Sequence, residues 1–113
     1  MIEALRDGTV TVIATDHAPH TETDKMVEFD YAPFGIVGLE TAVNVVLTEL
    51  YHKNSFTLPQ VISKFTQGPA ELLGLPTGTL ENGRAADITI LAPEEKGVVD
   101  ASKFRSKSRN TPF

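Results

Sequence analysis

The chain has 113 residues, of which 41% are hydrophobic and 22% charged, values close to those of ordinary soluble globular domains. Ten basic and fifteen acidic residues give a net charge of −5, which argues against a general nucleic-acid-binding protein. No cysteine is present, which excludes disulfides and thiolate zinc sites. The sequence shows no apolar run of the roughly 20 residues that span a bilayer, and its start lacks the order of a signal peptide. We therefore expect a cytoplasmic protein.

The first predicted elements are the end of a helix and a buried strand. Residues Arg6 to Gly8 supply turn chemistry between them. Residues Val10 to Ala14 are β-branched and nearly continuously apolar, as is typical of a strand buried on both faces of a parallel sheet. The polar stretch Thr15 to His20 follows at the carboxyl end of this strand. Barrel and doubly wound enzymes place their active sites at such strand ends.

A long loop and a helix are predicted next. Residues 21–35 are polar and then rich in proline and glycine, and a loop of this length in a compact domain is usually functional or disordered. From Gly38 to Lys53 the apolar residues recur at helical spacing and make one stripe.

A second helix is expected to begin at Thr57, because Thr57 and Gln60 match the capping-box pattern. We expect Gly68-Pro69 to end that helix. A further helical turn over residues 70–73 should stop at Gly74.

The character of the sequence changes near residue 77. Residues Asp87 to Ala92 read as a strand, flanked by turn signals. Helical material gives way to β material near residue 77, so we place a domain boundary between residues 1–76 and residues 77–113. Four basic residues alternate in the tail: Lys103, Arg105, Lys107 and Arg109. In an extended strand they would share one side, which we expect to face solvent or a partner. A phosphate-binding site is the less favoured alternative.

One buried strand, two amphipathic helices and a little β material do not close a core. A buried parallel strand needs neighbours on both sides, and this sequence offers none. We therefore expect the chain to be a piece of a longer protein.

Asp16, His17 and His20 form the cluster that carries chemistry. Aspartate can bind a divalent metal and accept a proton from a metal-bound water, and histidine can bind metal or donate to an anionic group. From spacing alone, a catalytic Asp16 and a simple strand-end cap are equally acceptable interpretations. A metal-binding role for all three residues is the weaker one.

The stretch from Ile13 to His20 resembles the last barrel-strand motif of dihydroorotases of the longer bacterial type, members of the amidohydrolase superfamily. The stretch from Ala32 to Ala42 resembles the loop and helix that follow it in that family. Gly68-Pro69-Ala70 and the stretch from Gly83 to Ile88 resemble segments shared with allantoinases and dihydropyrimidinases, and the stretch from Ser106 to Phe113 resembles the closing region. The resemblance implies an α/β fold, the carboxy-terminal part of a TIM-like (β/α)8 barrel plus part of a small β subdomain.

The resemblance also implies an activity, a zinc-dependent hydrolysis in pyrimidine biosynthesis that opens dihydroorotate to N-carbamoyl-L-aspartate. Asp16 then contacts the metal and acts as general base and acid, taking a proton from the metal-bound hydroxide and passing it to the leaving ring nitrogen. His20 helps bind the substrate carboxylate, and the backbone groups of Phe34 and Gly35 bind the ring. His17 has no assigned role, and a structural contact is favoured for it; a packed turn is the plain alternative for Phe34-Gly35.

The family's metal centre also uses a His-x-His pair, a carboxylate or modified lysine, and further histidines, and these have no counterpart in this chain. His52 reads as a surface residue, and Lys25, Lys53 and Lys64 show no buried apolar context suited to a modified lysine. Because a single carboxylate holds zinc weakly, we expect these residues alone to bind no zinc and to be inactive.

Two further hypotheses stay open. One is an allantoinase-type or dihydropyrimidinase-type enzyme. The other is a non-catalytic dihydroorotase-like scaffold that binds a transcarbamoylase. The partners implied are the small-molecule substrate and either a second copy in a homodimer or an aspartate transcarbamoylase, with no nucleic acid and no membrane.

Overall fold

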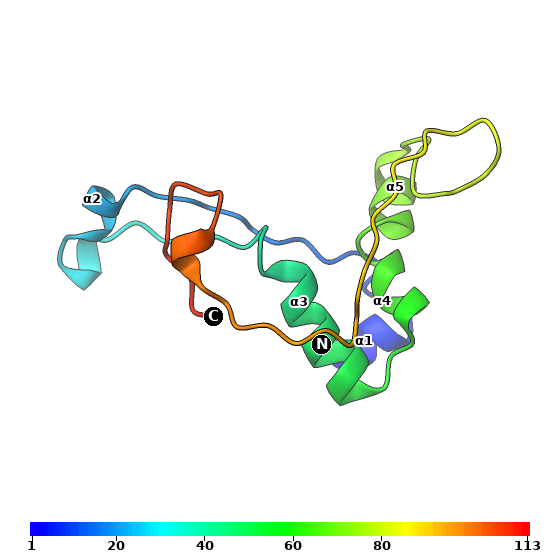
Figure 1. Cartoon of the computed structure of the whole chain (residues 1–113), viewed down its shortest axis with the longest axis horizontal. Coiled ribbons are helices and arrows are strands. Elements are labelled where there is room, and N and C mark those ends of the chain that lie inside the picture. Colours follow the sequence, from blue (N-terminus) through cyan, green and yellow to red (C-terminus); the bar gives the residue numbers. More distant parts are fainter. The chain divides into compact units, whose positions relative to one another are not determined.

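A computed structural model describes all residues from Met1 to Phe113. The chain divides into two compact units. Unit 1 comprises Met1–Ala14 and Val46–Glu95, and unit 2 comprises Thr15–Val45 and Lys96–Phe113. Figure 1 shows helices joined by long segments without regular structure, and no strand is formed. None of these helices has the length and apolar character that a membrane crossing requires.

Unit 1 is built from helices around an apolar core. Its elements are α1 (Ile2–Arg6), the π-helix η2 (Leu47–His52), α4 (Leu58–Ser63) and α5 (Gln67–Leu73). Helix α4 packs against η2 and α5. The buried apolar side chains of this unit are Leu5, Leu47, Leu50, Phe56, Val61 and Ala70.

Helix α4 begins where the sequence predicts. Thr57 is its N-cap, and its hydroxyl accepts a hydrogen bond from the Gln60 amide while the Gln60 side chain accepts one from the Thr57 amide. This reciprocal pair satisfies two of the amide groups that a helix start leaves without a partner. The capping box read from the sequence is therefore confirmed.

The prediction that Gly68-Pro69 ends this helix is wrong. Helix α4 ends at Ser63, and Gly68 and Pro69 lie in the first turn of α5 instead. Proline is accepted there because the first helical turn does not use its amide hydrogens within the helix. The predicted stop at Gly74 is confirmed: Gly74 is the C-cap of α5 in the left-handed conformation, with φ +65°.

Unit 2 has shorter elements. They are α2 (Glu22–Lys25), the 3-10 helix η1 (Phe29–Tyr31), most of α3 (Ala42–Val46) and the 3-10 helix η3 (Ala101–Lys103). The predicted loop at residues 21–35 is therefore partly helical. The signal for α2 was local: Thr21 and Asp24 form a capping box of their own.

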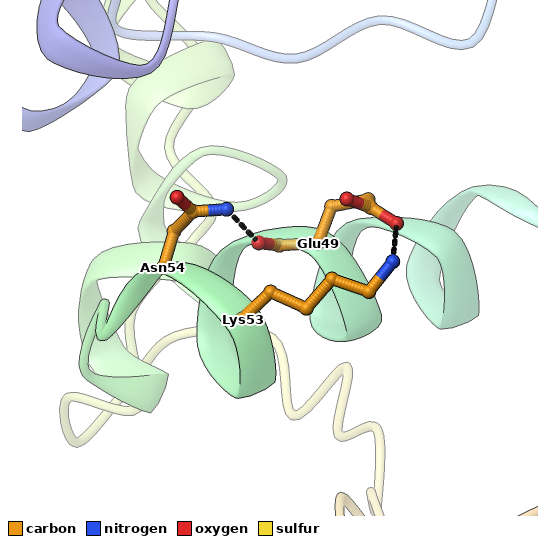
Figure 2. Close-up of polar contacts among 3 residues, drawn as sticks. All are labelled: Glu49, Lys53 and Asn54. Atoms are coloured by element: carbon orange, nitrogen blue, oxygen red, sulfur yellow. Dashed lines mark hydrogen bonds and ion pairs between the residues drawn. The ribbon is translucent and has the colours of Figure 1, made fainter.

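The predicted helix over residues 38–53 is formed with a later start and a change of type. Helix α3 begins at Ala42, and from Leu47 the chain continues as the π-helix η2. Figure 2 shows how this helix ends. The Asn54 side-chain amide donates to the Glu49 carbonyl at 2.6 Å, and the exposed Lys53 and Glu49 side chains pair at 2.5 Å. Asn54 thus takes up a carbonyl that the end of the helix leaves free.

Both predicted strands, residues 10–14 and 87–92, are wrong for this structure. A strand exists only when its backbone pairs with a neighbour, and no parallel neighbour is present. The amides of Val10 and Ile13 bond instead to the carbonyls of Ala4 and Lys64, at 2.8 and 3.1 Å. The one trace of sheet pairing is an isolated parallel bridge between His17 and Ile36.

The basic tail is not the extended strand that its alternation predicts. It begins with η3 and continues through bends at residues 105–107. The Glu40 carboxylate accepts the amides of Arg105 and Ser106, at 2.9 and 3.0 Å. The Arg109 guanidinium folds back onto the carbonyls of Phe104 and Ser106. Backbone amides, which the pattern of side chains does not reveal, decide the course of this segment.

Candidate active site

Asp16 lies at the end of the extended apolar segment, in an unusual backbone conformation. Its φ is +47°, one of only two positive values among the non-glycine residues. Aspartate tolerates this left-handed region better than most residues because its short polar side chain avoids the clash. The carboxylate is exposed and makes no hydrogen bond or ion pair within the chain. Asp16 is therefore available to a ligand.

His17 links the segment of Asp16 to the segment that follows Gly35. The Gly38 and Leu39 amides donate to His17 Nδ1, at 3.1 and 3.4 Å. Because Nδ1 accepts these bonds, the neutral ring carries its proton on Nε2. The bridge to Ile36 holds the backbone of the same residue, and the Ala18 amide donates to the Ile36 carbonyl at 2.9 Å. The structural contact expected of His17 is thus formed.

Gly35 brings its own segment against His20. Its φ is +127°, a conformation that residues with a side chain rarely adopt. A Cβ atom at Gly35 would lie 2.7 Å from the Ala18 Cβ and 3.1 Å from His20 Nε2. Only glycine permits this approach. The structure thus places His20 beside Gly35, and the Phe34 side chain before it is 97% exposed.

Gly38 allows a second close approach on the same segment. A Cβ atom there would lie 2.9 Å from the Thr15 carbonyl oxygen. The residues on both sides of Asp16, Thr15 and His17, therefore rest on the start of the Gly38 segment. This close packing holds the backbone on both sides of Asp16 in place.

Lys25 and Asn110 also reach this site, through contacts that were not predicted from the sequence. Lys25 Nζ donates to the carbonyls of Pro33 and Gly35, at 2.5 and 2.9 Å. The Asn110 side-chain amide donates to the same Gly35 carbonyl at 2.7 Å. Asn110 is 75 residues from Gly35 in sequence, so no local pattern could reveal its contact. For Lys25 the only signal was its place at the end of a capped helix.

Helix α2 carries a carboxylate near His20. The pKa of Asp24 is lowered chiefly by hydrogen bonds from the side chain and backbone of Thr21, and slightly by the charge of His20. Asp24 is exposed, so this charge is screened by solvent. The main role of Asp24 is to cap α2, which places Lys25 in the last turn.

The residues of this chain do not by themselves fit a zinc ion. No group of three or more histidine, cysteine, aspartate or glutamate side chains lies close enough together to hold a metal. Asp16 offers one carboxylate, while protein zinc sites use three or four ligands. His52 is exposed, with its ring nitrogen 2.8 Å from the Pro93 carbonyl oxygen.

The predicted environments of Lys25 and Lys64 need correction. Lys25 is partly buried and bonded to two carbonyls, and Lys64 is only 9% exposed, with Nζ donating to the Val10 carbonyl at 2.7 Å. These contacts satisfy the ammonium groups, which burial would otherwise penalise. Lys53, in contrast, is exposed and paired with Glu49.

Known proteins are similar in sequence to this chain along nearly its whole length. The chain is 59% identical over 111 residues to a dihydroorotase of Pelotomaculum thermopropionicum and covers 26% of that protein, with 98% of this chain aligned. It is 52% identical over 113 residues to the dihydroorotase of Bacillus subtilis and 50% identical to that of Acetivibrio thermocellus. In both cases the whole chain aligns with 26% of the relative.

The chain thus spans about a quarter of the length of the curated relatives it matches. The model of the amidohydrolase family matches residues 1–111. This chain belongs to the amidohydrolase family.

Proposed function

We propose that this chain supplies one side of the active site of a dihydroorotase, an enzyme that reversibly opens dihydroorotate to N-carbamoyl-L-aspartate. One observation carries the proposal: the fold holds Gly35 against His20 and against Ala18, two residues after Asp16, whose carboxylate is exposed and has no partner in the chain. The names of the relatives support the choice of substrate. The remaining parts of the site, including the barrel strands beside residues 10–14, would come from outside these 113 residues.

The reaction needs one proton to move. Water adds its oxygen to the carbonyl carbon of the cyclic amide, the bond from that carbon to the ring nitrogen breaks, and the nitrogen leaves with a proton. A carboxylate near the reacting atoms can take the proton from water and return it to nitrogen. Asp16 suits this role because its carboxylate has no partner in the chain to give up first.

The other residues bind and orient the substrate. His20 can donate a hydrogen bond to a substrate carboxylate, and the amides of Phe34 and Gly35 can donate to the ring carbonyls. The closeness of His20 to Gly35 allows one small, flat molecule to reach both. Positioning of this kind lowers the barrier by holding the reactants in the reactive geometry.

Zinc enters the proposal as a group that the chain does not hold alone. Asp16 is its one ligand in these residues, and the others would be contributed by the rest of the enzyme. In the same proposal residues 1–76 belong to a TIM-like barrel and residues 77–113 to a small β subdomain, in a cytoplasmic protein that forms a homodimer or binds an aspartate transcarbamoylase.

Substrate profiling of the full-length protein that contains these residues tests the function. We expect ring closure of N-carbamoyl-L-aspartate and opening of dihydroorotate, with no turnover of allantoin or dihydrouracil. Turnover of either of the latter would assign a different cyclic amidohydrolase. A protein without zinc and without turnover of any of them would be a non-catalytic scaffold.

A further inference from the structure

Lys25 makes the most unusual polar contact of unit 2. Its single ammonium group donates to two backbone carbonyls, those of Pro33 and Gly35, which lie on either side of Phe34. The side chain is partly buried, so these bonds are shielded from water more than those of an exposed lysine. Hydrogen bonds from a charged donor are stronger than those between neutral groups. The ammonium therefore holds the carbonyl that precedes Phe34 and the carbonyl that ends Gly35, one on each side of this pair of residues.

Asn110 secures the same place from another part of the sequence. Its side chain donates to the Gly35 carbonyl, and its own carbonyl accepts the Val37 amide at 2.9 Å. The Gly35 oxygen therefore receives two donors, Lys25 and Asn110, and each occupies one lone pair. With the Ile36 carbonyl, which accepts the Ala18 amide, residues 33–37 are held at four points by groups from other parts of the chain.

These contacts decide which backbone groups remain for a ligand. The carbonyls of Pro33 and Gly35 are occupied, whereas the amides of Phe34 and Gly35 donate no hydrogen bond within the chain. The segment therefore offers two free donors, while its Pro33, Gly35 and Ile36 carbonyls already accept hydrogen bonds. A donor pair of this kind suits a molecule that presents carbonyl or carboxylate oxygens.

We infer that Lys25 and Asn110 are positioning residues: they hold the 33–37 segment so that the Phe34 and Gly35 amides face oxygen atoms of the substrate. This inference rests on the proposed function for the nature of the substrate. The holding of the segment itself does not depend on it. Lys25 acts through the backbone and does not touch the reacting atoms.

Steady-state kinetics of the full-length protein test the binding role. In Lys25→Met the ammonium is replaced by an uncharged chain of similar length, and we expect the KM for dihydroorotate to rise about ten-fold while kcat changes less than about three-fold. Lys25→Arg keeps the charge and several donors and should restore most of the KM. Asn110→Ala should raise the KM by a smaller factor, because Lys25 still holds the Gly35 carbonyl. Lys53→Met is the matched control and should change neither constant, since Lys53 pairs only with exposed Glu49.

Amide hydrogen exchange in peptides that cover residues 33–39, which include the hydrogen-bonded amides of Val37, Gly38 and Leu39, tests the holding role without any turnover. We expect faster exchange in Lys25→Met and in Asn110→Ala, and wild-type exchange in Lys25→Arg and Lys53→Met. A raised KM with unchanged exchange would overturn the inference, because Lys25 would then act on the substrate by charge alone. Unchanged KM, or a loss confined to kcat, would overturn it as well. If the wild-type protein fails to turn over dihydroorotate, the proposed function fails, and the exchange data still decide whether Lys25 and Asn110 hold the segment.

Discussion

Each of the two units of this chain is stabilised by a different kind of interaction. Unit 1 buries six apolar side chains from α1, η2, α4, α5 and the residues between them. Unit 2 buries only one large apolar side chain, Val37, together with the polar Thr41 and Ser108. Its order comes from directional bonds made by His17, Lys25, Glu40 and Asn110. The candidate active site lies entirely in unit 2.

This difference teaches where each unit is vulnerable. Apolar burial is non-directional and tolerates changes of equal volume, whereas a hydrogen bond is lost when one donor or acceptor is removed. Single polar substitutions should therefore disturb unit 2, and changes of volume should disturb unit 1. The following predictions, from the largest effect to the smallest, test this contrast.

The largest effect is expected from Asp16→Asn in the full-length protein. Because asparagine cannot accept and return the proton, turnover of dihydroorotate should fall by about 10²- to 10⁴-fold. The fold should persist, since asparagine also tolerates a positive φ. Steady-state assays and circular dichroism measure the two effects. Retention of more than about a tenth of the wild-type rate would contradict the role in proton transfer.

In unit 1 the core substitution Phe56→Ala should be the most damaging. Phe56 is 4% exposed, and its ring carries the Arg6 guanidinium at 5.1 Å from the centroid. Loss of the ring should lower the free energy of unfolding by about 3–5 kcal/mol. Urea denaturation measures this. As the control, Phe34→Ala removes a fully exposed ring and should leave the unfolding midpoint unchanged.

Gly68→Ala should be the next most damaging change in unit 1. A Cβ atom at Gly68 would lie 2.3 Å from the Thr11 carbonyl oxygen and 3.0 Å from that of Ser63. The backbone must move to relieve this overlap, at a cost of about 1–3 kcal/mol. Gly97→Ala, where nothing lies within 4 Å, is the matched control for thermal unfolding. Equal melting temperatures in the two variants would show that the approach of residue 11 to α5 is not tight.

The smallest effect concerns pH and the anchor of the tail. The pKa of the Glu40 carboxyl is lowered chiefly by the Arg105 amide and then by the Ser106 amide. A lowered pKa in the folded chain means that the anchor is fully present above the ordinary carboxyl range and is lost as the pH falls below it. The Arg105 and Ser106 amide resonances should therefore shift between about pH 5 and pH 3. In Glu40→Gln this titration should be absent; if it persists, another carboxyl is responsible.

Several local signals in the sequence predict the structure correctly, although Gly68-Pro69 does not end a helix and the capping box at Thr21 was not predicted; the non-local features are not predicted. The capping box of Thr57 and Gln60 predicts a helix start, and Gly74 predicts a helix end. Both predictions succeed because the groups involved lie within a few residues of one another. The strands at residues 10–14 and 87–92 failed because strand formation depends on a partner that the chain does not contain. Residue composition indicates that a segment is suited to a strand, but a strand forms only when its backbone pairs with a neighbouring strand.

The same distinction applies to the candidate site. Asp16, His20 and Gly35 could be named from short motifs, and the structure adds that Gly35 lies against His20. The contacts of Lys25 and Asn110 could not be named, because they are made to backbone carbonyls and leave no pattern in side-chain type. A structural contact was expected for His17 without a named partner, and the structure shows that its ring accepts the Gly38 amide.

The positive φ of Asp16 has a consequence for how loss of function would be detected. Asparagine suits this conformation as well as aspartate does, whereas β-branched or bulky residues would strain it by about 1–3 kcal/mol. Variants that keep the fold and lose the carboxylate are therefore the ones that the backbone accepts most easily. A screen for expression level or thermal stability would not distinguish such variants from the wild type. Only an assay of the reaction would distinguish an active protein from an inactive variant.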